Sequence, residues 1–389
     1  MDKTIRHHFK KIVLSFIVFL ASISYSQSLI INHDCARLNS IPLQWIDSAK
    51  AKLHIAYGHT SHGSQLITGM DGLSDWKGAQ YAYNNGGTDG ALDLHDGAMP
   101  GDLGNPDRTT WASETYEFLK NHDNNDVNVI IWSWCGQAST GDSNHIITYL
   151  NLMSALEDSF PAVKFVYMTG HLDGSGINGD LNQRNEQIRR YCRSNNKILY
   201  DFADMESYDP DGNFYLDKMA NDNCDYDSDN NGSQDKNWAE DWMNAHVENV
   251  DWYNCSAAHS KALNGNRKAY AAWWLWASLA GWNGIAGAGN ENLINKSYAL
   301  YQNYPNPFNP TTNFEFRIPA LPAGKSNFEF VTLKVYDVLG KEITTLVNEE
   351  KPSGVYKINF EADNLSSGVY FYTLRAGNFV ETKKMIFIR

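Results

Sequence analysis

Long apolar segments, basic residues and cysteines are all scarce in this chain of 389 residues. The longest apolar run, Ile12 to Ile23, is too short for a comfortable membrane span. The chain has 32 basic against 45 acidic residues, and this deficit argues against nucleic acid as a main partner. No cysteine directly follows the apolar run, which argues against a lipoprotein anchor.

The first 26 residues have the layout of a secretory leader. Four basic residues precede the apolar run, and the small residues Ser24 and Ser26 flank a cleavage point before Gln27. The sequence therefore predicts a signal peptide at 1–26, an exported mature protein and no transmembrane span after cleavage.

The mature chain has an odd number of cysteines, which leaves at least one thiol free: Cys35, Cys135, Cys192, Cys224 and Cys255. Export through an oxidising compartment permits disulfides. One hypothesis pairs Cys224 with Cys255, although spacing alone does not determine the connectivity.

The mature chain divides into two domains. The glycine-rich segment 283–297 has no apolar periodicity and reads as a linker. It separates a core, 27–282, from a C-terminal part, 298–389, whose short alternating runs predict a small antiparallel β-sandwich. These runs are Asn313 to Ile318, Val331 to Val338, Val355 to Phe360, Val369 to Arg375 and Lys384 to Ile388.

The C-terminal part begins with a distinctive box from Tyr301 to Thr312, which contains Pro-Asn-Pro-Phe-Asn-Pro. With the later segments Val335 to Lys341 and Ser367 to Tyr370, it resembles type IX secretion sorting domains of type A. The resemblance implies transport by the type IX secretion machinery across the outer membrane of a Gram-negative cell, followed by release or attachment to the cell surface. An ordinary adhesive β-sandwich is the alternative.

The core alternates between short apolar runs and longer amphipathic segments. The strand candidates are Lys52 to Tyr57, Val127 to Trp132, Val163 to Met168 and Ile198 to Phe202. The helix candidates are Thr110 to Asn121, Ile146 to Ser159, Asn182 to Ser194 and Arg267 to Leu279. This alternation predicts a three-layer α/β sandwich with a parallel sheet, whose chemistry lies at the carboxyl ends of the strands.

Each strand candidate runs into small or polar residues. After the first comes Gly58-His59-Thr60-Ser61-His62-Gly63-Ser64, where flanking glycines suit a sharp strand-to-helix turn that exposes a nucleophile. Ser61 is the first candidate and Ser64 the second, and helix capping is the alternative role for both. Gln137 follows the second strand as a candidate oxyanion donor, and His171 follows the third as a substrate-orienting group. His259, before the last helix, is the candidate base.

This order of parts resembles the SGNH (GDSL-like) hydrolases, through the Ser61 segment, the helix and strand at 182–202 and the block from His259 to Gly265. The resemblance implies an esterase or deacetylase. It has departures: Gly-His-Thr-Ser replaces Gly-Asp-Ser, and Ser256 stands where the acid partner of the histidine is usual. Asp251 and Asp173 are the candidate substitutes.

A second motif lies near 222–241, in a predicted insertion. Asp227, Asp229, Asn231, Ser233 and Asp235 alternate around Gly232 in the pattern of calcium-binding loops. We expect one structural Ca²⁺ there, with Glu240 or Asp241 completing its ligands because position twelve is Trp238. A solvated acidic loop is the alternative.

The sequence thus predicts a secreted or surface-attached serine esterase or deacetylase without an organic cofactor, acting on acyl groups such as those of extracellular glycans. Two alternatives stay open. A non-catalytic glycan-binding module would use exposed tryptophans, for which the candidates are Trp132, Trp134, Trp273, Trp274 and Trp276. A metal-dependent hydrolase or lyase would use His59, His62 and His171.

Overall fold

The computed structural model describes residues 28–283, 298–303, 305–318, 328–352, 354–362, 365–377 and 379–389. The predicted signal peptide, 1–26, and the predicted linker apart from Asn283 lie outside these residues. Within the described ranges, no helix has the length and apolar character needed to cross a membrane.

The core is built on a seven-stranded sheet in the order β1-β7-β6-β5-β2-β4-β3, in which every neighbouring pair is parallel. The strands are β1 (Leu29–Ile31), β2 (His54–Gly58), β3 (Tyr83–Asn84), β4 (Leu92–Asp96), β5 (Val129–Trp132), β6 (Lys164–Met168) and β7 (Ile198–Tyr200). After β2 the chain forms β3 and β4 on one side and then returns to form β5 on the other. The strand order therefore reverses between β2 and β5, the place where doubly wound sheets bind ligands.

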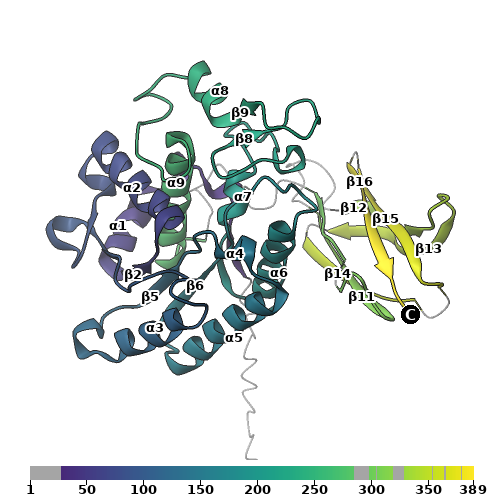
Figure 1. The fold of residues 1–389 in the computed structure, drawn as a ribbon, viewed down its shortest axis with the longest axis horizontal. Coiled ribbons are helices and arrows are strands. Elements are labelled where there is room, and N and C mark those ends of the chain that lie inside the picture. The colour runs from purple at the N-terminus through teal and green to yellow at the C-terminus, as the bar shows by residue number, and fades with distance from the viewer. Residues whose placement is uncertain are drawn as a thin grey trace, which may run out of the picture.

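Helices cover both faces of this sheet (Figure 1). On one face pack α1 (Leu43–Lys52), α2 (Ser64–Lys77) and α9 (Ala262–Leu279); on the other pack α3 (Thr110–Lys120), α5 (Ser143–Ser159) and α6 (Asp180–Ser194). Side chains alternate along each strand, so Ile55 and Tyr57 join the first layer and Ala56 the second. The predicted α/β class with a parallel sheet is confirmed.

Shorter elements complete the core. The short α-helices are α4 (Gln137–Thr140), α7 (Phe202–Glu206) and α8 (Trp238–Ala245). The 3-10 helices are η1 (His33–Cys35), η2 (Leu38–Ser40), η3 (Ser61–Gly63), η4 (Ala79–Tyr81), η5 (Thr88–Gly90), η6 (His122–Asn124) and η7 (Leu216–Lys218). Between β7 and α9, the antiparallel pair β8 (Asp225–Tyr226) and β9 (Lys236–Asn237) closes the predicted calcium loop.

All five cysteines of the mature chain are free thiols, so the hypothesised bridge between Cys224 and Cys255 is wrong for this structure. The Cys224 sulfur lies 3.6 Å from the Ser260 hydroxyl, whereas the Cys255 sulfur lies 3.5 Å from the carbonyl of Ala262. Each thiol thus contacts a different polar partner near the start of α9.

The C-terminal strands form two antiparallel sheets, β10-β11-β14 and β13-β12-β15-β16. They are β10 (Ala299–Leu300), β11 (Thr311–Ile318), β12 (Phe328–Tyr336), β13 (Glu342–Pro352), β14 (Gly354–Glu361), β15 (Gly368–Ala376) and β16 (Phe379–Phe387). One apolar cluster packs between the sheets. The predicted antiparallel β-structure is confirmed, and β13 is a strand that the alternation did not indicate.

The proline-rich box anchors the start of this domain to its last strand. The Asn306 side chain accepts a hydrogen bond from the N–H of Ile386 at 2.8 Å, and buried Phe308 pairs its backbone with Ile386 and Ile388. Asn303, fully buried, donates to Thr312 and to the carbonyl of Pro305. The box is therefore explained by packing and hydrogen bonding within the domain.

Candidate active site at the carboxyl edge of the parallel sheet

The loop after β2 places the predicted nucleophiles at the switch point. Ser61 begins η3 and is exposed, and its hydroxyl makes no hydrogen bond to any described residue. The Ser64 hydroxyl donates to the carbonyl of Ser61 at 2.6 Å, a local bond at the start of α2. Ser64 therefore has a local structural partner, whereas the Ser61 hydroxyl is available.

Two glycines, Gly58 at the end of β2 and Gly63 in the loop that follows, are required because a side chain would not fit, rather than by an unusual backbone angle. A Cβ on Gly58 would lie 2.4 Å from the Trp132 ring, and one on Gly63 would lie 2.0 Å from the Ser133 hydroxyl. Gly63 itself has φ −62°, which any residue adopts. The loop after β2 consequently sits tightly against the end of β5.

Three histidines from three separate loops stack on one another, and the middle one, His62, directly follows Ser61 in the chain. The ring of His62 lies between those of His171 and His259, with centroids 4.1 and 4.5 Å away and interplanar angles of 9° and 16°. His62 follows β2, His171 follows β6, and His259 precedes α9. His259 has φ +62°, a left-handed conformation that is uncommon outside glycine. The fold thus brings two predicted site residues, His171 and His259, together through His62.

The carboxylate of this cluster is Asp222, which the sequence analysis missed. Its Oδ2 atom is 2.9 Å from Nε2 of His62, and the ligand atoms of His62, Asp222 and His259 all lie within 4.8 Å of one another. The two acids considered as partners of His259 have other roles. Asp173 accepts hydrogen bonds from Ser175, and Asp251 accepts one from the N–H of Val247.

The surroundings of the pair fix its protonation. Burial lowers the pKa of His62 despite its bond to Asp222. Burial tends to raise the pKa of Asp222, but hydrogen bonding and the charges of His62 and His171 outweigh it and lower that pKa. At neutral pH Asp222 is therefore ionised and a neutral His62 donates through Nε2. The other nitrogen of His62, Nδ1, is then an acceptor and lies 3.3 Å from the sulfur of Cys135.

Gln137, the candidate oxyanion donor, is turned toward a buried carboxylate. Its amide nitrogen makes a long contact of 3.5 Å with Oδ2 of Asp102, which also accepts the Thr60 hydroxyl at 2.5 Å. Asp102 is almost fully buried and ties the β2 loop to the start of α4. His59, a residue of the metal alternative, instead bonds Asp96 at 2.6 Å.

A buried ion pair lies beneath the histidines. Lys268 of α9 and Glu206 of α7 are both 0% exposed, with 2.6 Å between Nζ and Oε1, and Lys268 also donates to Gln65. Glu206 accepts the N–H of Leu172, the neighbour of His171, at 2.7 Å. Gln65 donates to the carbonyl of Ala258, the neighbour of His259, at 2.5 Å. One buried network therefore connects the segments that carry all three histidines.

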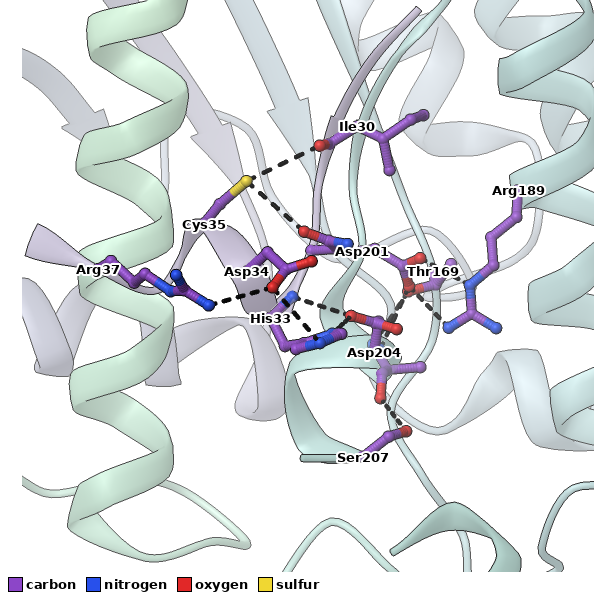
Figure 2. A network of polar contacts seen from close by, with 12 residues as sticks. Ile30, His33, Asp34, Cys35, Arg37, Thr169, Arg189, Asp201, Asp204 and Ser207 are labelled. Carbon is purple, nitrogen blue, oxygen red and sulfur yellow. Dashed lines mark hydrogen bonds and ion pairs between the residues drawn. The ribbon is translucent and has the colours of Figure 1, made fainter. Parts of the chain in front are cut away.

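A second polar network lies at the carboxyl ends of β1 and β7 (Figure 2). Arg189 binds both carboxylate oxygens of Asp201 at 2.6 and 2.8 Å, and His33 bonds Asp204 at 2.5 Å. The pKa of Asp204 is lowered to about 2, because His33 and Arg189 outweigh the effect of its burial. This network joins edge strand β1 to α6 and α7, and its carboxylates are already held by Arg189 and His33, so we assign it to stability.

The predicted ligands of the calcium loop lie close together in the structure, which does not itself test whether Ca²⁺ binds there. Asp227 accepts the N–H groups of Asn231 and Gly232, and Asp235 accepts hydrogen bonds from Ser228. Asp229 and Ser233 each bond Asn231. Calcium binding here stays a prediction.

The tryptophans of the glycan-binding alternative are core residues. Trp132, Trp134, Trp273, Trp274 and Trp276 are at most 3% exposed. Because their rings pack against the sheet, they do not form a surface for sugar stacking, and that alternative loses the residues on which it depended.

Comparison with known proteins bears mainly on the C-terminal domain. No curated protein sequence matches the chain. Among solved structures, matches include an endo-beta-1,4-mannanase from Thermotoga petrophila (10% identity, TM-score 0.19, 67% of this chain and 47% of that one). An FMN-binding beta-glucuronidase from Facaelibacterium prausnitzii L2-6 matches at 12% identity and a TM-score of 0.18, over 71% and 44% of the two chains. The chain thus spans about half the length of these proteins, and TM-scores this low do not establish a shared fold.

The family comparison agrees with the sorting motif found in the sequence. Residues 302–389 match the family described as "Secretion system C-terminal sorting domain". This confirms the predicted sorting domain and implies an exported protein that is secreted or attached to the cell surface.

Proposed function

We propose that the core is an exported hydrolase that cleaves acyl esters by nucleophilic attack, with Ser61 as nucleophile and His259 as base. The observation that carries the proposal is the convergence of His259, His62 and Asp222 at the carboxyl edge of the sheet, where the exposed Ser61 directly precedes His62 in the chain. The SGNH resemblance is consistent with this choice of nucleophile and base.

In the proposed reaction, the Ser61 hydroxyl attacks the ester carbonyl and gives its proton to His259. Asp222 stabilises the imidazolium charge that forms, and so replaces the acid that SGNH hydrolases usually have at the position of Ser256. Helix starts carry unpaired N–H groups, and those around η3 and α2 stabilise the oxyanion. The proton on His259 then passes to the leaving alcohol, and water releases the acyl group by the same steps in reverse.

One contact favours a second nucleophile for the same reaction. The Cys135 sulfur lies 3.3 Å from Nδ1 of His62, whose Nε2 donates to Asp222. His62 thus connects a thiol to a carboxylate, as the base of a nucleophilic site does. In this version the thiol proton passes to His62, and the thiolate of Cys135 attacks the ester.

The sorting domain bears on the substrate. We propose that it directs the core through the type IX machinery across the outer membrane of a Gram-negative cell. The core would then meet acyl groups on extracellular polymers, for instance acetylated glycans, rather than cytoplasmic metabolites.

The test is hydrolysis of p-nitrophenyl acetate and acetylated glycans by the full chain and its variants. Ser61→Ala and His259→Ala should each lower kcat/KM by about 100-fold or more. Ser113→Ala, an exposed serine on α3, is the matched control and should change nothing. Loss of activity in Cys135→Ala but not in Ser61→Ala would assign the thiol instead. Full activity in both Ser61→Ala and Cys135→Ala would refute the acyl-transfer proposal.

A further inference from the structure

Two groups of three metal-ligating side chains converge within the described part of the chain. One is His62, Asp222 and His259, and the other is His54, Asp93 and Asp126. The second has a single imidazole and lies at the start of β2, away from the switch point, with Asp126 largely exposed. The first combines two imidazoles with a carboxylate at the carboxyl edge of the sheet.

The first group has the donor set of a transition-metal site. Imidazole nitrogen and carboxylate oxygen both bind Zn²⁺, and catalytic zinc sites use three protein ligands with a fourth position left for water or substrate. Nε2 of His62 is already 2.9 Å from Oδ2 of Asp222. A metal ion between them would replace the proton that they now share.

The surroundings also meet the needs of such a site. Nδ1 of His62 lies 3.3 Å from the Cys135 sulfur, which would accept its N–H once Nε2 binds the ion. Asp222 is held by a backbone hydrogen bond from its N–H to the carbonyl of Leu172 at 3.0 Å. His62 is 8% exposed, Asp222 is 23% exposed and His259 is on the surface, so an ion reaches the group from the His259 side.

We propose that His62, Asp222 and His259 bind a divalent transition-metal ion, with Zn²⁺ as the best match to their donor atoms. This set differs from the one expected from the sequence, because His59 is committed to Asp96 and His171 stacks on His62 outside the converging group. The metal site does not rest on the proposed ester hydrolysis, although the two share Asp222 and His259. If both are correct, bound Zn²⁺ occupies the lone pair with which His259 would accept the Ser61 proton, and Zn²⁺ inhibits the hydrolysis.

Metal binding is measured directly, without reference to activity. The full chain is titrated with Zn²⁺ by calorimetry, and Co²⁺ serves as a spectroscopic probe of the ligands. Asp222→Asn and His259→Asn should each weaken Zn²⁺ binding by at least about 100-fold, since loss of an outer-shell partner alone costs about 10–100-fold. Asparagine suits the left-handed backbone of His259, which limits the effect on folding.

Two controls separate the possible outcomes. His54→Ala disables the other converging group, and Ser61→Ala disables the proposed nucleophile, and both should retain wild-type Zn²⁺ affinity. Binding by Ser61→Ala without hydrolysis would support both proposals. The metal site is refuted if the wild-type chain does not bind Zn²⁺, if affinity is unchanged in Asp222→Asn and His259→Asn, or if only His54→Ala loses binding.

Discussion

Replacing Lys268 with methionine tests the buried network beneath the histidines. The change keeps an unbranched side chain of similar length but leaves the fully buried Glu206 carboxylate without its cation. It also removes the donor to Gln65, whose amide holds the carbonyl next to His259. Removing one partner of a buried ion pair costs about 3–5 kcal/mol, because the remaining charge stays uncompensated.

The measurement is urea unfolding, followed by a thermal melt of the same variants. A loss of about 3–5 kcal/mol corresponds to a fall in Tm of about 6–20 °C for a domain of this size. Lys261→Met is the matched control, because Lys261 also pairs with a glutamate at 2.6 Å but near the surface. It should cost about 1 kcal/mol or less.

The double variant Lys268→Met/Glu206→Gln separates loss of packing from loss of charge balance. Removing the stranded charge should restore at least about half of the lost stability, since a neutral amide still accepts the Leu172 N–H. The reasoning is refuted if Lys268→Met costs no more than Lys261→Met, or if the double variant is no more stable than Lys268→Met.

Three further predictions concern other parts of the core. Gly63→Ala should cost about 1–3 kcal/mol in urea unfolding, because its Cβ would overlap a buried serine hydroxyl, whereas Gly136→Ala, with open space around it, should be nearly neutral. If the loop at Asp227 binds Ca²⁺, a chelator should lower the Tm, and Ca²⁺ at about 100 times its Kd should restore about 2.7 kcal/mol of unfolding free energy. A Tm that changes with neither the chelator nor Ca²⁺ would rule out the calcium site. The pKa of Asp204 is about 2 in the folded protein, against 3.8 for the unfolded chain. Its ionised form therefore stabilises the fold at pH values above 3.8, and this stabilisation is lost as the pH falls toward 2. His33→Ala should therefore cost about 1–2 kcal/mol near pH 7 but much less near pH 2, and an equal cost at both would contradict that origin.

The inner strands could be predicted because their sequences are almost entirely apolar. Val129–Trp132 and residues 165–168 are buried on both faces of the sheet, and this produces the continuous apolar runs from which they were inferred. Three strands of the parallel sheet were not predicted from the sequence. β1 and β3 are too short to show a period, and β4, Leu-Asp-Leu-His-Asp, carries charged side chains on its less covered face.

The candidate site was only partly predictable, because its acid depends on distant contacts. Ser61, His171 and His259 were found because each lies next to a recognisable strand or helix. Asp222 follows no strand and sits in a long insertion, where its N–H pairs with Leu172 and its neighbour Asn221 forms a bridge with Asp173. No local pattern in the sequence indicates these pairings.

The buried ion pair of Lys268 and Glu206 connects the separate loops that form the candidate site. His62, His171 and His259 lie on three loops far apart in the sequence, and loops are the parts of a fold that move most easily. Lys268 and Glu206 stand between these loops, where each hydrogen bond is strengthened by the absence of water and each missing partner is costly. A network of this kind penalises any displacement of one loop relative to the others. If the core hydrolyses esters as proposed, substitutions at Lys268 should change kcat as well as stability, while leaving Ser61 and Asp222 chemically intact.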